Sequence, residues 1–190
     1  MIGRIETLAL IRLACWQTLE RASHEMEHEW RHLVLATTAG EGAATHGDAR
    51  LVVLREVDAA AQTLTFFTDS RSPKVAQLRR QPLATMLAWS ALLGWQLRLR
   101  CVLDIQTDGL AVSSRWARLK MMPGAYDYLS PLAPGVALDS PWSPLAPVRA
   151  ERASFAVVTA KVEVIDWLEL HADGHRRAVF NDLGESWVNP

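Results

Sequence analysis

The alternation of apolar and polar residues between positions 83 and 106 constrains the fold of this chain more than any other feature. From Trp95 to Ile105 every second residue is apolar, and the residues between are mostly polar or charged. This period of two is typical of a β-strand that buries one face. Residues 83–90 are predicted as a second strand, with a turn near Gly94. A turn this short joins antiparallel strands, so the sequence predicts a hairpin over 83–106.

Periodicity predicts further strands and three helices along the chain. The strands are 32–38, 49–57, 63–68, 153–168 and about 176–181, and the helices are about 9–31, 73–80 and 111–121. Segments 49–57 and 63–68 form a second predicted hairpin. Successive antiparallel hairpins with few helices between them favour a mainly β barrel or sandwich with flanking helices. They argue against a doubly wound sheet.

Length and composition indicate one globular domain that covers residues 1–190. The chain is 49% hydrophobic and 22% charged, which is typical of a folded protein with a core. Six of the nine prolines fall within residues 123–149. Regular elements do not survive that proline density, so we expect a long ordered loop or a mobile flap there.

The sequence also favours some cellular settings over others. No apolar run approaches the roughly 20 residues of a membrane span, and the first 20 residues interleave charges too closely for a signal peptide. The two cysteines, Cys15 and Cys101, form no CxxC motif and no disulfide framework. We therefore expect a cytoplasmic protein with no membrane partner.

A basic segment with a helix start indicates a site for a small anion. Residues 50–100 carry eight basic and three acidic residues in a chain of formal net charge −1. An excess this confined indicates a small ligand rather than a nucleic acid, which needs a wider basic face. Within it, Ser72 is a predicted N-cap and Pro73 the first helical residue. The helix N-terminus, Lys74 and Arg71 could together hold a phosphate. The alternative is an ordinary capped surface helix.

The segment His24-Glu25-Met26-Glu27-His28 matches the H-E-x-x-H pattern of zinc hydrolases. Two observations oppose a zinc site. Both histidines lie far from the apolar face of the predicted helix, which carries Leu19, Ala22, Met26, Trp30 and Leu33. The segment is also rich in glutamate, as an exposed helix face is. We expect no metal here.

Several short motifs, in their order and spacing, resemble those of the pyridoxamine 5′-phosphate oxidase-like family. They are Arg50-Leu51-Val52-Val53-Leu54-Arg55, Phe66-Phe67-Thr68-Asp69, Ser72-Pro73-Lys74, Trp89 and Gln96. The resemblance implies an antiparallel, Greek-key-like split β-barrel that binds FMN. It also implies a homodimer with FMN at the subunit interface and a small-molecule substrate.

Carried over residue by residue, the resemblance implies a flavin site built from much of the chain. Arg50 and Lys74 would hold the FMN phosphate, with donors from Thr68 and Ser72. The flavin ring would contact the backbone of Val53 and Leu54 and the side chains of Arg55, Phe67 and Trp167. The Gln96 amide would reach it from the second subunit. Arg177 would take the place of a family arginine, because the position of that arginine is Val179 in this sequence. Because Arg50 and Arg55 are five apart, a straight strand would separate them, so the strand must bend or bulge.

The substrate side departs further from the family pattern. Arg55, Lys120 and Arg176 stand near positions where the resemblance implies substrate contacts. However, Pro73 replaces a basic residue, and Ala178 replaces a histidine. We therefore expect FMN-dependent oxidation of pyridoxamine or pyridoxine 5′-phosphate by oxygen. The alternatives are a flavin reductase or oxidase with another substrate, and a non-catalytic FMN-binding protein.

Overall fold

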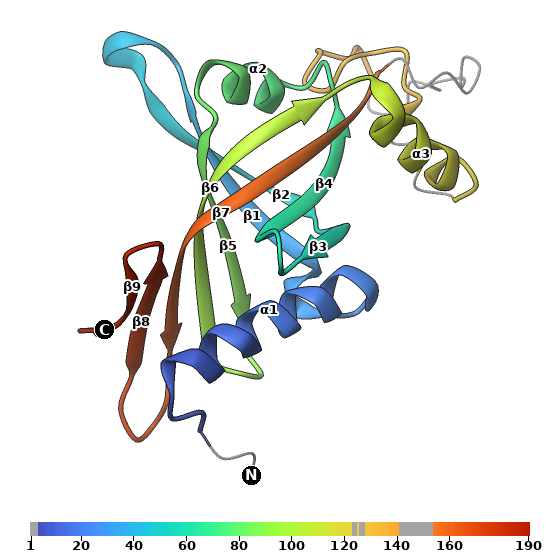
Figure 1. The fold of residues 1–190 in the computed structure, drawn as a ribbon. Coiled ribbons are helices and arrows are strands. Elements are labelled where there is room, and N and C mark those ends of the chain that lie inside the picture. Colours follow the sequence, from blue (N-terminus) through green and yellow to red (C-terminus); the bar gives the residue numbers. More distant parts are fainter. Residues whose placement is uncertain (1–3, 123–124, 126–127, 141–153) are drawn as a thin grey trace.

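The fold is one antiparallel sheet that curls into an open barrel, as the computed structural model shows (Figure 1). The structure describes residues 4–122, 125, 128–140 and 154–190. Within these residues the strand order is β2-β1-β5-β6-β7-β4-β3, with β8 on β7 and β9 on β8. In chain order the elements are α1 (Leu8–His24), η1 (Glu29–Arg31), β1 (His32–Ala39), η2 (Gly42–Ala44), β2 (His46–Val53), β3 (Glu56–Asp58), β4 (Thr63–Asp69), α2 (Pro73–Arg80), β5 (Leu83–Ser90), β6 (Trp95–Gln106), α3 (Gly109–Leu119), β7 (Phe155–Glu169), β8 (Arg176–Asn181) and β9 (Gly184–Val188).

Strand β7 is the longest strand described, and it serves two neighbours on one of its edges. Its first half pairs with β4, from Asp69 opposite Phe155 to Thr63 opposite Lys161. Its second half pairs with β8, from Ile165 opposite Phe180 to Glu169 opposite Arg176. The other edge pairs with β6 along nearly the whole length. The β4–α2 junction and β8 are therefore held at opposite ends of one strand.

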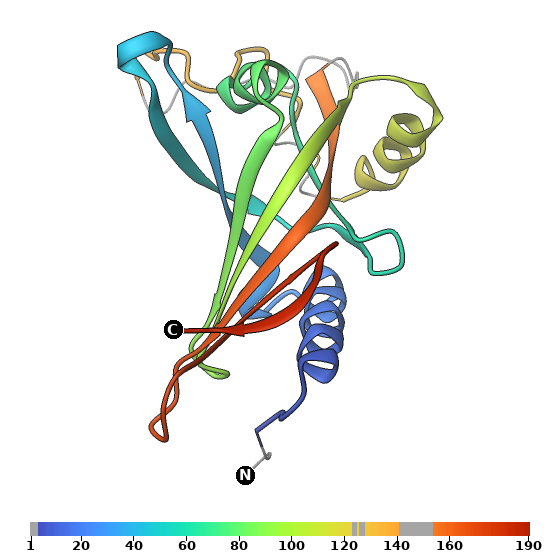
Figure 2. The same cartoon turned by 60° about the vertical axis from the view of Figure 1, so that its left-hand side comes forward.

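The barrel is split where β1 and β5 separate. Strand β1 pairs with β2 over all eight residues, but with β5 only through residues 34–36. Helix α2 covers the end where the strands diverge, and α1 lies across the opposite end (Figures 1 and 2). Ile11, Cys15 and Leu19 of α1 are fully buried in the main core. The antiparallel split barrel expected from the sequence is thus confirmed.

Several predicted elements have the predicted bounds, and their local signals explain why. The hairpin of β5 and β6 spans residues 83–106, and α2 spans residues 73–80. In the β5–β6 turn Gly94 has a φ of +64°, and a Cβ there would lie 2.5 Å from the Leu170 carbonyl oxygen. A glycine is needed for both reasons, because it alone lacks the Cβ that would clash.

The predicted helix over 9–31 is wrong in its last quarter. Helix α1 ends at His24, and Met26 is exposed rather than part of the apolar face. The buried Arg31 explains this end, because its Nη1 donates to the carbonyl oxygens of Ala22 (3.3 Å) and Ser23 (2.5 Å). These are carbonyls that a continuing helix would use for its own bonds. A distant side chain therefore terminates the helix.

The predicted hairpin of 49–57 with 63–68 is also wrong in part. Strand β2 pairs with β1, and only the three residues of β3 pair with β4. The chain leaves the ladder at Leu54 and Arg55, whose N–H groups donate to the carbonyls of Arg31 (2.9 Å) and Thr65 (2.8 Å). The chain therefore bends between Arg50 and Arg55, and a shared ligand for these two residues stays a prediction. The sequence also missed β9, which contains Trp187. Much of the predicted loop 123–149 lies outside the described residues.

Buried Glu169, the last residue of β7, anchors the N-terminal segment to the sheet. Arg4 Nε donates to Glu169 Oε2 at 2.9 Å, and Arg176 donates through Nε to Oε2 (2.8 Å) and through Nη2 to Oε1 (3.1 Å). Burial alone would raise the pKa of Glu169, but the hydrogen bonds from Arg176 and Arg4 outweigh it and lower the pKa. The carboxylate therefore stabilises the fold in its charged form.

We predict that Glu169→Gln lowers the free energy of unfolding by about 2 kcal/mol at neutral pH, because charged hydrogen bonds are lost. A carboxyl with a lowered pKa stabilises the fold above its unfolded pKa, about 4.3, and this stabilisation is lost as pH falls through the folded pKa. Urea unfolding of both proteins at pH 7 and pH 3.5 measures the difference, which should shrink at the lower pH. Glu185→Gln, which breaks the exposed pair with Arg12, is the control. Equal losses for the two variants would contradict the prediction.

Candidate functional site

Three polar side chains converge where β4 meets α2. Lys74 Nζ lies 3.1 Å from Thr68 Oγ1 and 3.3 Å from Ser72 Oγ, and the two hydroxyl oxygens are 3.4 Å apart. Thr68 and Ser72 are buried, while Lys74 is half-buried. Ser72 is the N-cap residue, as predicted, but its hydroxyl makes no capping bond. It faces Lys74 instead. In the first turn of α2, Pro73 has no N–H and the Val75 N–H donates to the Ser72 carbonyl oxygen at 3.0 Å, so the cluster would hold an anion mainly through its side chains.

The electrostatics of Lys74 suit it to an anionic ligand. Burial lowers the pKa of its amine, and nearby Arg50 lowers it further, while Asp69 and Asp48 act in the opposite sense. Within the described residues, the hydrogen bonds of this amine go to hydroxyl groups and not to a carboxylate. A partly desolvated cation without a paired carboxylate gains from binding an anion.

Arg50 points toward the same mouth of the barrel from β2. Its Nη1 donates to Thr37 Oγ1 (2.5 Å), and its Nη2 donates to Gln77 Oε1 (3.0 Å) and forms an ion pair with Asp48. The sequence analysis missed Thr37, Asp48 and Gln77. Two of them carried a signal, because Asp48 is two residues before Arg50 on one strand and Gln77 is three residues after Lys74 on one helix.

Arg71, which the sequence analysis placed beside the phosphate, is bonded to other groups in this structure. It forms a two-point ion pair with Asp69, with Nε–Oδ1 at 3.0 Å and Nη2–Oδ2 at 2.7 Å. The same guanidinium donates to the carbonyl oxygens of Ser130 (2.8 Å) and Pro131 (3.1 Å). The hydrogen bond with Asp69 raises the pKa of Arg71. Arg71 therefore fixes the loop over α2, and its role in place of the basic residue missing at Pro73 stays a prediction.

Arg55 and Phe67 lie together beyond the end of β2. The guanidinium carbon of Arg55 is 5.8 Å from the centre of the Phe67 ring, and its buried Nε has no hydrogen-bond partner among the described residues. Phe67 packs edge-on against Phe155, with ring centres 5.1 Å apart. Val53 is half-buried and Leu54 fully buried, with the Leu54 N–H already bonded to Arg31. The orphaned Arg55 Nε is a second feature that a negatively charged ligand would satisfy.

Gln96 and Arg177 lie away from this cluster. Gln96 is opposite Trp89 beside the β5–β6 turn, at the end of the sheet remote from α2 (Figure 1). Arg177 donates to Asp166 from Nε (2.9 Å) and Nη2 (2.8 Å). Both face outward in one row, because Gln96 pairs with Leu168 and Leu168 with Arg177. Within one chain they do not complete the site around Lys74.

The remaining predicted residues are also dispersed. Trp167 is fully buried in the core, with its ring centre 5.3 Å from that of Trp95, so it has no exposed surface for a ligand in this chain. Arg176 lies 5.7 Å from the Trp167 ring and is paired with Glu169. It shares the inner face with Glu169, whereas Arg177 faces outward. Lys120 is exposed at the end of α3.

The H-E-x-x-H segment does not form the helix face that a zinc site needs. Only His24 belongs to α1, and His28 caps η1 by accepting a hydrogen bond from the Trp30 N–H at 3.0 Å through Nδ1. In the described part of the chain, no three His, Cys, Asp or Glu residues are grouped to hold a metal. The same part contains no helix long and apolar enough to cross a membrane.

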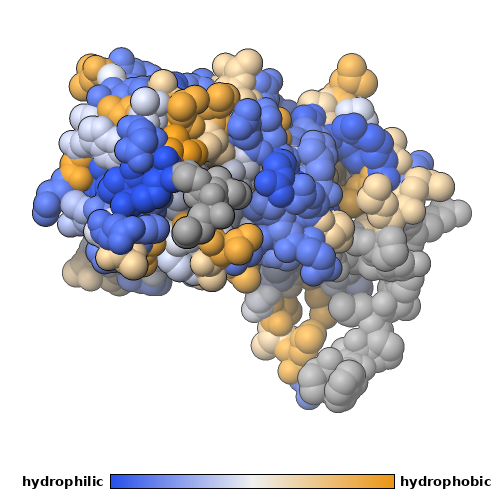
Figure 3. All heavy atoms as spheres, turned by 90° about the horizontal axis from the view of Figure 1, so that it is seen from below, coloured by the Kyte–Doolittle hydropathy of each residue, from blue (hydrophilic) through white to orange (hydrophobic). Residues whose placement is uncertain are grey.

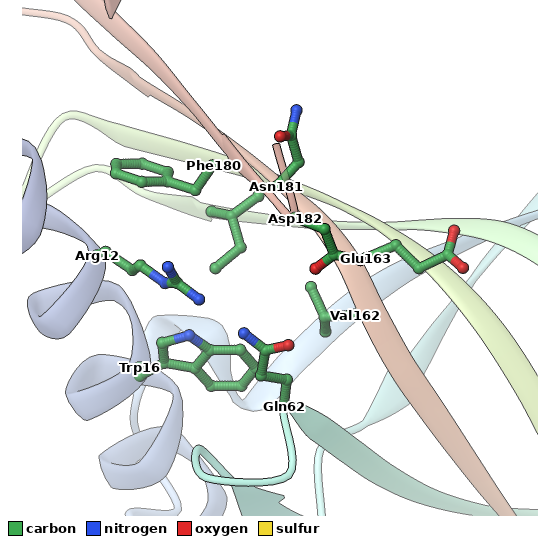
Figure 4. Close-up of a pocket in the computed structure, with 9 residues that line it drawn as sticks. Arg12, Trp16, Gln62, Val162, Glu163, Phe180, Asn181 and Asp182 are labelled. Atoms are coloured by element: carbon green, nitrogen blue, oxygen red, sulfur yellow. The ribbon is translucent and has the colours of Figure 1, made fainter. Parts of the chain in front are cut away.

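Two cavities lie apart from the predicted flavin residues. A space of about 10 Å³ between α1, β7 and β8 is lined by Arg12, Trp16, Gln62 and their neighbours (Figure 4), which is room for about one water. A groove of about 690 Å³ lies between α1 and the β5–β6 turn, at the end viewed in Figure 3. Neither cavity contains a residue predicted to hold FMN, so the Lys74 cluster is the better candidate.

The sequence matches the family described as pyridoxamine 5′-phosphate oxidase, FMN-binding domain, over residues 13–107, which is half of the chain. This protein belongs to that family. FMN is therefore its cofactor, as the sequence analysis expected. Thr68, Ser72, Lys74 and Arg50 all lie inside the matched segment and form a basic, hydroxyl-lined cluster that fits the phosphate of FMN.

Solved structures show the same fold over nearly the whole chain. A pyridoxamine 5′-phosphate oxidase-related, FMN-binding protein from Nostoc punctiforme is 24% identical, with a TM-score of 0.69, covering 97% of this chain and 100% of its own. PhzG from Burkholderia lata, in complex with tetrahydrophenazine-1-carboxylic acid, is 17% identical, with a TM-score of 0.64, covering 97% and 94%. No curated protein matches the sequence.

We predict that the double substitution Arg50→Ala with Lys74→Ala weakens FMN binding at least hundredfold and leaves the fold intact. Each cation is expected to contribute a charged hydrogen bond to the phosphate, and both are lost. Fluorescence titration gives the FMN dissociation constant, and far-ultraviolet circular dichroism checks the fold. Arg79→Ala, which removes an exposed arginine from the same helix, should change little. Unchanged FMN affinity in the double variant would exclude this cluster as the phosphate site.

Proposed function

We propose that this protein is an FMN-dependent oxidoreductase that holds the cofactor phosphate at the Lys74 cluster. The observation that carries the proposal is the amine of Lys74, bonded to two buried hydroxyls, beside Arg50 and the uncapped start of α2. Bound FMN would supply hydride and electron transfer, which no side chain of the protein provides. The contribution of the chain is to position the cofactor and to set the charge around it.

The contacts on the substrate side favour a molecule other than a vitamin B6 phosphate. Arg176, one predicted substrate residue, is bonded to Glu169 at two points and lies over the rings of Trp167 and Trp187. Releasing it would leave a buried carboxylate short of a partner, which is costly. Lys120 is exposed at the end of α3. PhzG bound to tetrahydrophenazine-1-carboxylic acid illustrates another ligand on this fold.

Oxidation of pyridoxamine or pyridoxine 5′-phosphate, the activity expected from the sequence, becomes the second candidate. Arg55 supports it, because this arginine has an unpartnered Nε beside the end of β2. A guanidinium in that place could contact either the flavin or an anionic substrate. It is one basic group, however, and a substrate phosphate is usually held by several. The two candidates therefore differ in which substrate turns over, and not in the cofactor.

We further propose that two copies pair through the outer face of β2, β1 and β5. Leu51, Leu83 and Trp89 are exposed by 64%, 52% and 44%. The register places Leu51, Val34 and Leu87 side by side on that face. A continuous exposed apolar strip is typical of an interface. Trp89 shares its row with Gln96 and Arg177, so pairing would present Gln96 of the partner subunit to a flavin from outside its own chain.

To test the function, the protein is loaded with FMN and desalted, and its absorbance is recorded. Pyridoxamine 5′-phosphate is then added under air. We expect a bound-flavin band and no pyridoxal 5′-phosphate above the rate of free FMN, because Arg176 is engaged internally. Flavin reduction by other small amines, alcohols and reduced nicotinamides is then measured without oxygen. Rapid formation of pyridoxal 5′-phosphate would instead establish the second candidate. A loaded protein whose flavin no donor reduces would contradict the oxidoreductase proposal.

The pairing is tested with Leu51→Asp combined with Leu83→Asp. Two buried carboxylates without partners are expected to raise the dimer dissociation constant at least hundredfold. Light scattering after size-exclusion chromatography measures the mass, and FMN retention should fall with it. Leu92→Asp, which adds a charge at the exposed β5–β6 turn, is the matched control. A dimer that persists in the double variant would exclude this face.

A further inference from the structure

The terminal nitrogens of Arg50 already have partners in this structure. Its Nη1 donates to the Leu35 carbonyl (3.4 Å) and to Thr37 Oγ1 (2.5 Å). Its Nη2 donates to Gln77 Oε1 (3.0 Å) and is ion-paired with Asp48. Each terminal nitrogen of a guanidinium has two N–H groups, so these contacts use all four. A phosphate can reach a terminal nitrogen of Arg50 only by displacing one of them.

Among the partners of Arg50, Asp48 is the one that a phosphate would displace most easily, because it is negatively charged and partly exposed to water. It lies two residues before Arg50 on β2, on the same face. Its side chain is 39% exposed, against 20% for Arg50, so water can take over its solvation. Thr37 and Gln77 are neutral, and they also bond to each other, with the Thr37 hydroxyl donating to Gln77 Oε1 at 2.6 Å. Among these partners, Asp48 is the one whose negative charge competes directly with that of a phosphate.

The carboxylate of Asp48 is held in its charged form close to the phosphate site. Gln77 Nε2 donates to its Oδ2 at 2.8 Å, and this bond, together with Arg50, lowers the pKa of Asp48. Asp48 therefore stays ionised at neutral pH. A phosphate monoester carries a charge of about −1.5 to −2 at that pH. Two anions sharing one guanidinium repel each other.

The remaining charges do not offset this repulsion. Asp69 is fully engaged with Arg71, and that pair contributes no net charge. Asp48 similarly neutralises Arg50, which leaves Lys74 as the unpaired cation of the cluster among the described residues. Arg50 and Asp48 also act on Lys74 electrostatically, Arg50 by lowering the pKa of its amine and Asp48 by raising it.

We propose that Asp48 is a counter-ion that competes with the FMN phosphate for Arg50 and so weakens cofactor binding. The inference rests on the proposed function, because it takes the Lys74 cluster as the phosphate site. Asp48 acts on the cofactor through Arg50, and it is not a catalytic residue. Gln77 and Thr37 hold the guanidinium in place without charge, so Asp48 is not needed for that purpose. The consequence is an FMN that exchanges with solution more readily than the number of basic residues would indicate.

The test compares FMN with riboflavin, which lacks the phosphate. In Asp48→Asn the side chain keeps its shape and can still accept from Gln77 Nε2, but it loses its charge. We expect FMN to bind about three- to tenfold more tightly and riboflavin to bind unchanged, as for the removal of one partly exposed charge. Asp48→Glu keeps the charge and should retain the weak FMN binding. The ratio of the FMN to the riboflavin dissociation constant is a readout that a merely structural role would not move.

Glu41→Gln is the matched control. Like Asp48, Glu41 pairs with an arginine, in this case Arg80 of α2, but its side chain is 86% exposed and lies outside the cluster. It should leave the ratio unchanged. Unchanged or weaker FMN binding in Asp48→Asn, or an equal gain in riboflavin affinity, would contradict the proposal that Asp48 is a counter-ion. If Arg50→Ala with Lys74→Ala keeps full FMN affinity, the phosphate site itself fails and the counter-ion with it. The two failures are distinguishable, since the first leaves the double variant weakened.

Discussion

The sharing of β7 between two partners is the constraint on which the arrangement of this protein depends. One edge of β7 pairs with β4 and then with β8, so the sheet must divide at the point of change. That division holds the β4–α2 junction at one end and the β8 arginines at the other (Figure 2). Because a regular β-strand cannot bring its two ends together, the predicted flavin residues separate into two groups. Within one chain the two groups do not meet, and this separation supports the proposed pairing of two copies.

Around Lys74 the chain offers fewer free charges than its basic composition indicates. Arg71 is bonded to Asp69 and to the carbonyls of the neighbouring loop, and Arg50 is bonded to Asp48. Partly buried arginines gain from such partners, since an unpaired charge away from water is costly. Lys74 differs because its partners are hydroxyls. The free cation of the cluster is thus set by which carboxylates lie nearby, and not by the count of basic residues.

The two sides of the candidate site differ in how far their residues are engaged by the fold. On the phosphate side, Lys74 lies within hydrogen-bonding distance of Thr68 and Ser72, in a segment that the family match covers. On the substrate side, Arg176 serves the fold by tying β8 to β7 through Glu169. Trp167 likewise fills the core. A residue committed to the fold is poorly placed to change partners when a substrate binds, because a buried carboxylate would lose its counter-charge.

The sequence by itself determined those elements whose signals are local. Alternation set the bounds of β5 and β6, and the serine and proline at residues 72 and 73 set the start of α2. The resemblance to the family also led to the prediction that Arg50 and Lys74 hold the FMN phosphate. Tertiary structure decided the rest. Arg31 ends α1 by bonding its last carbonyls, and Leu54 and Arg55 leave the ladder through bonds to other segments. Gln77 becomes a partner of Arg50 and Asp48 only when α2 lies against β1 and β2, because hydrogen bonds between distant segments leave no periodic trace in a sequence.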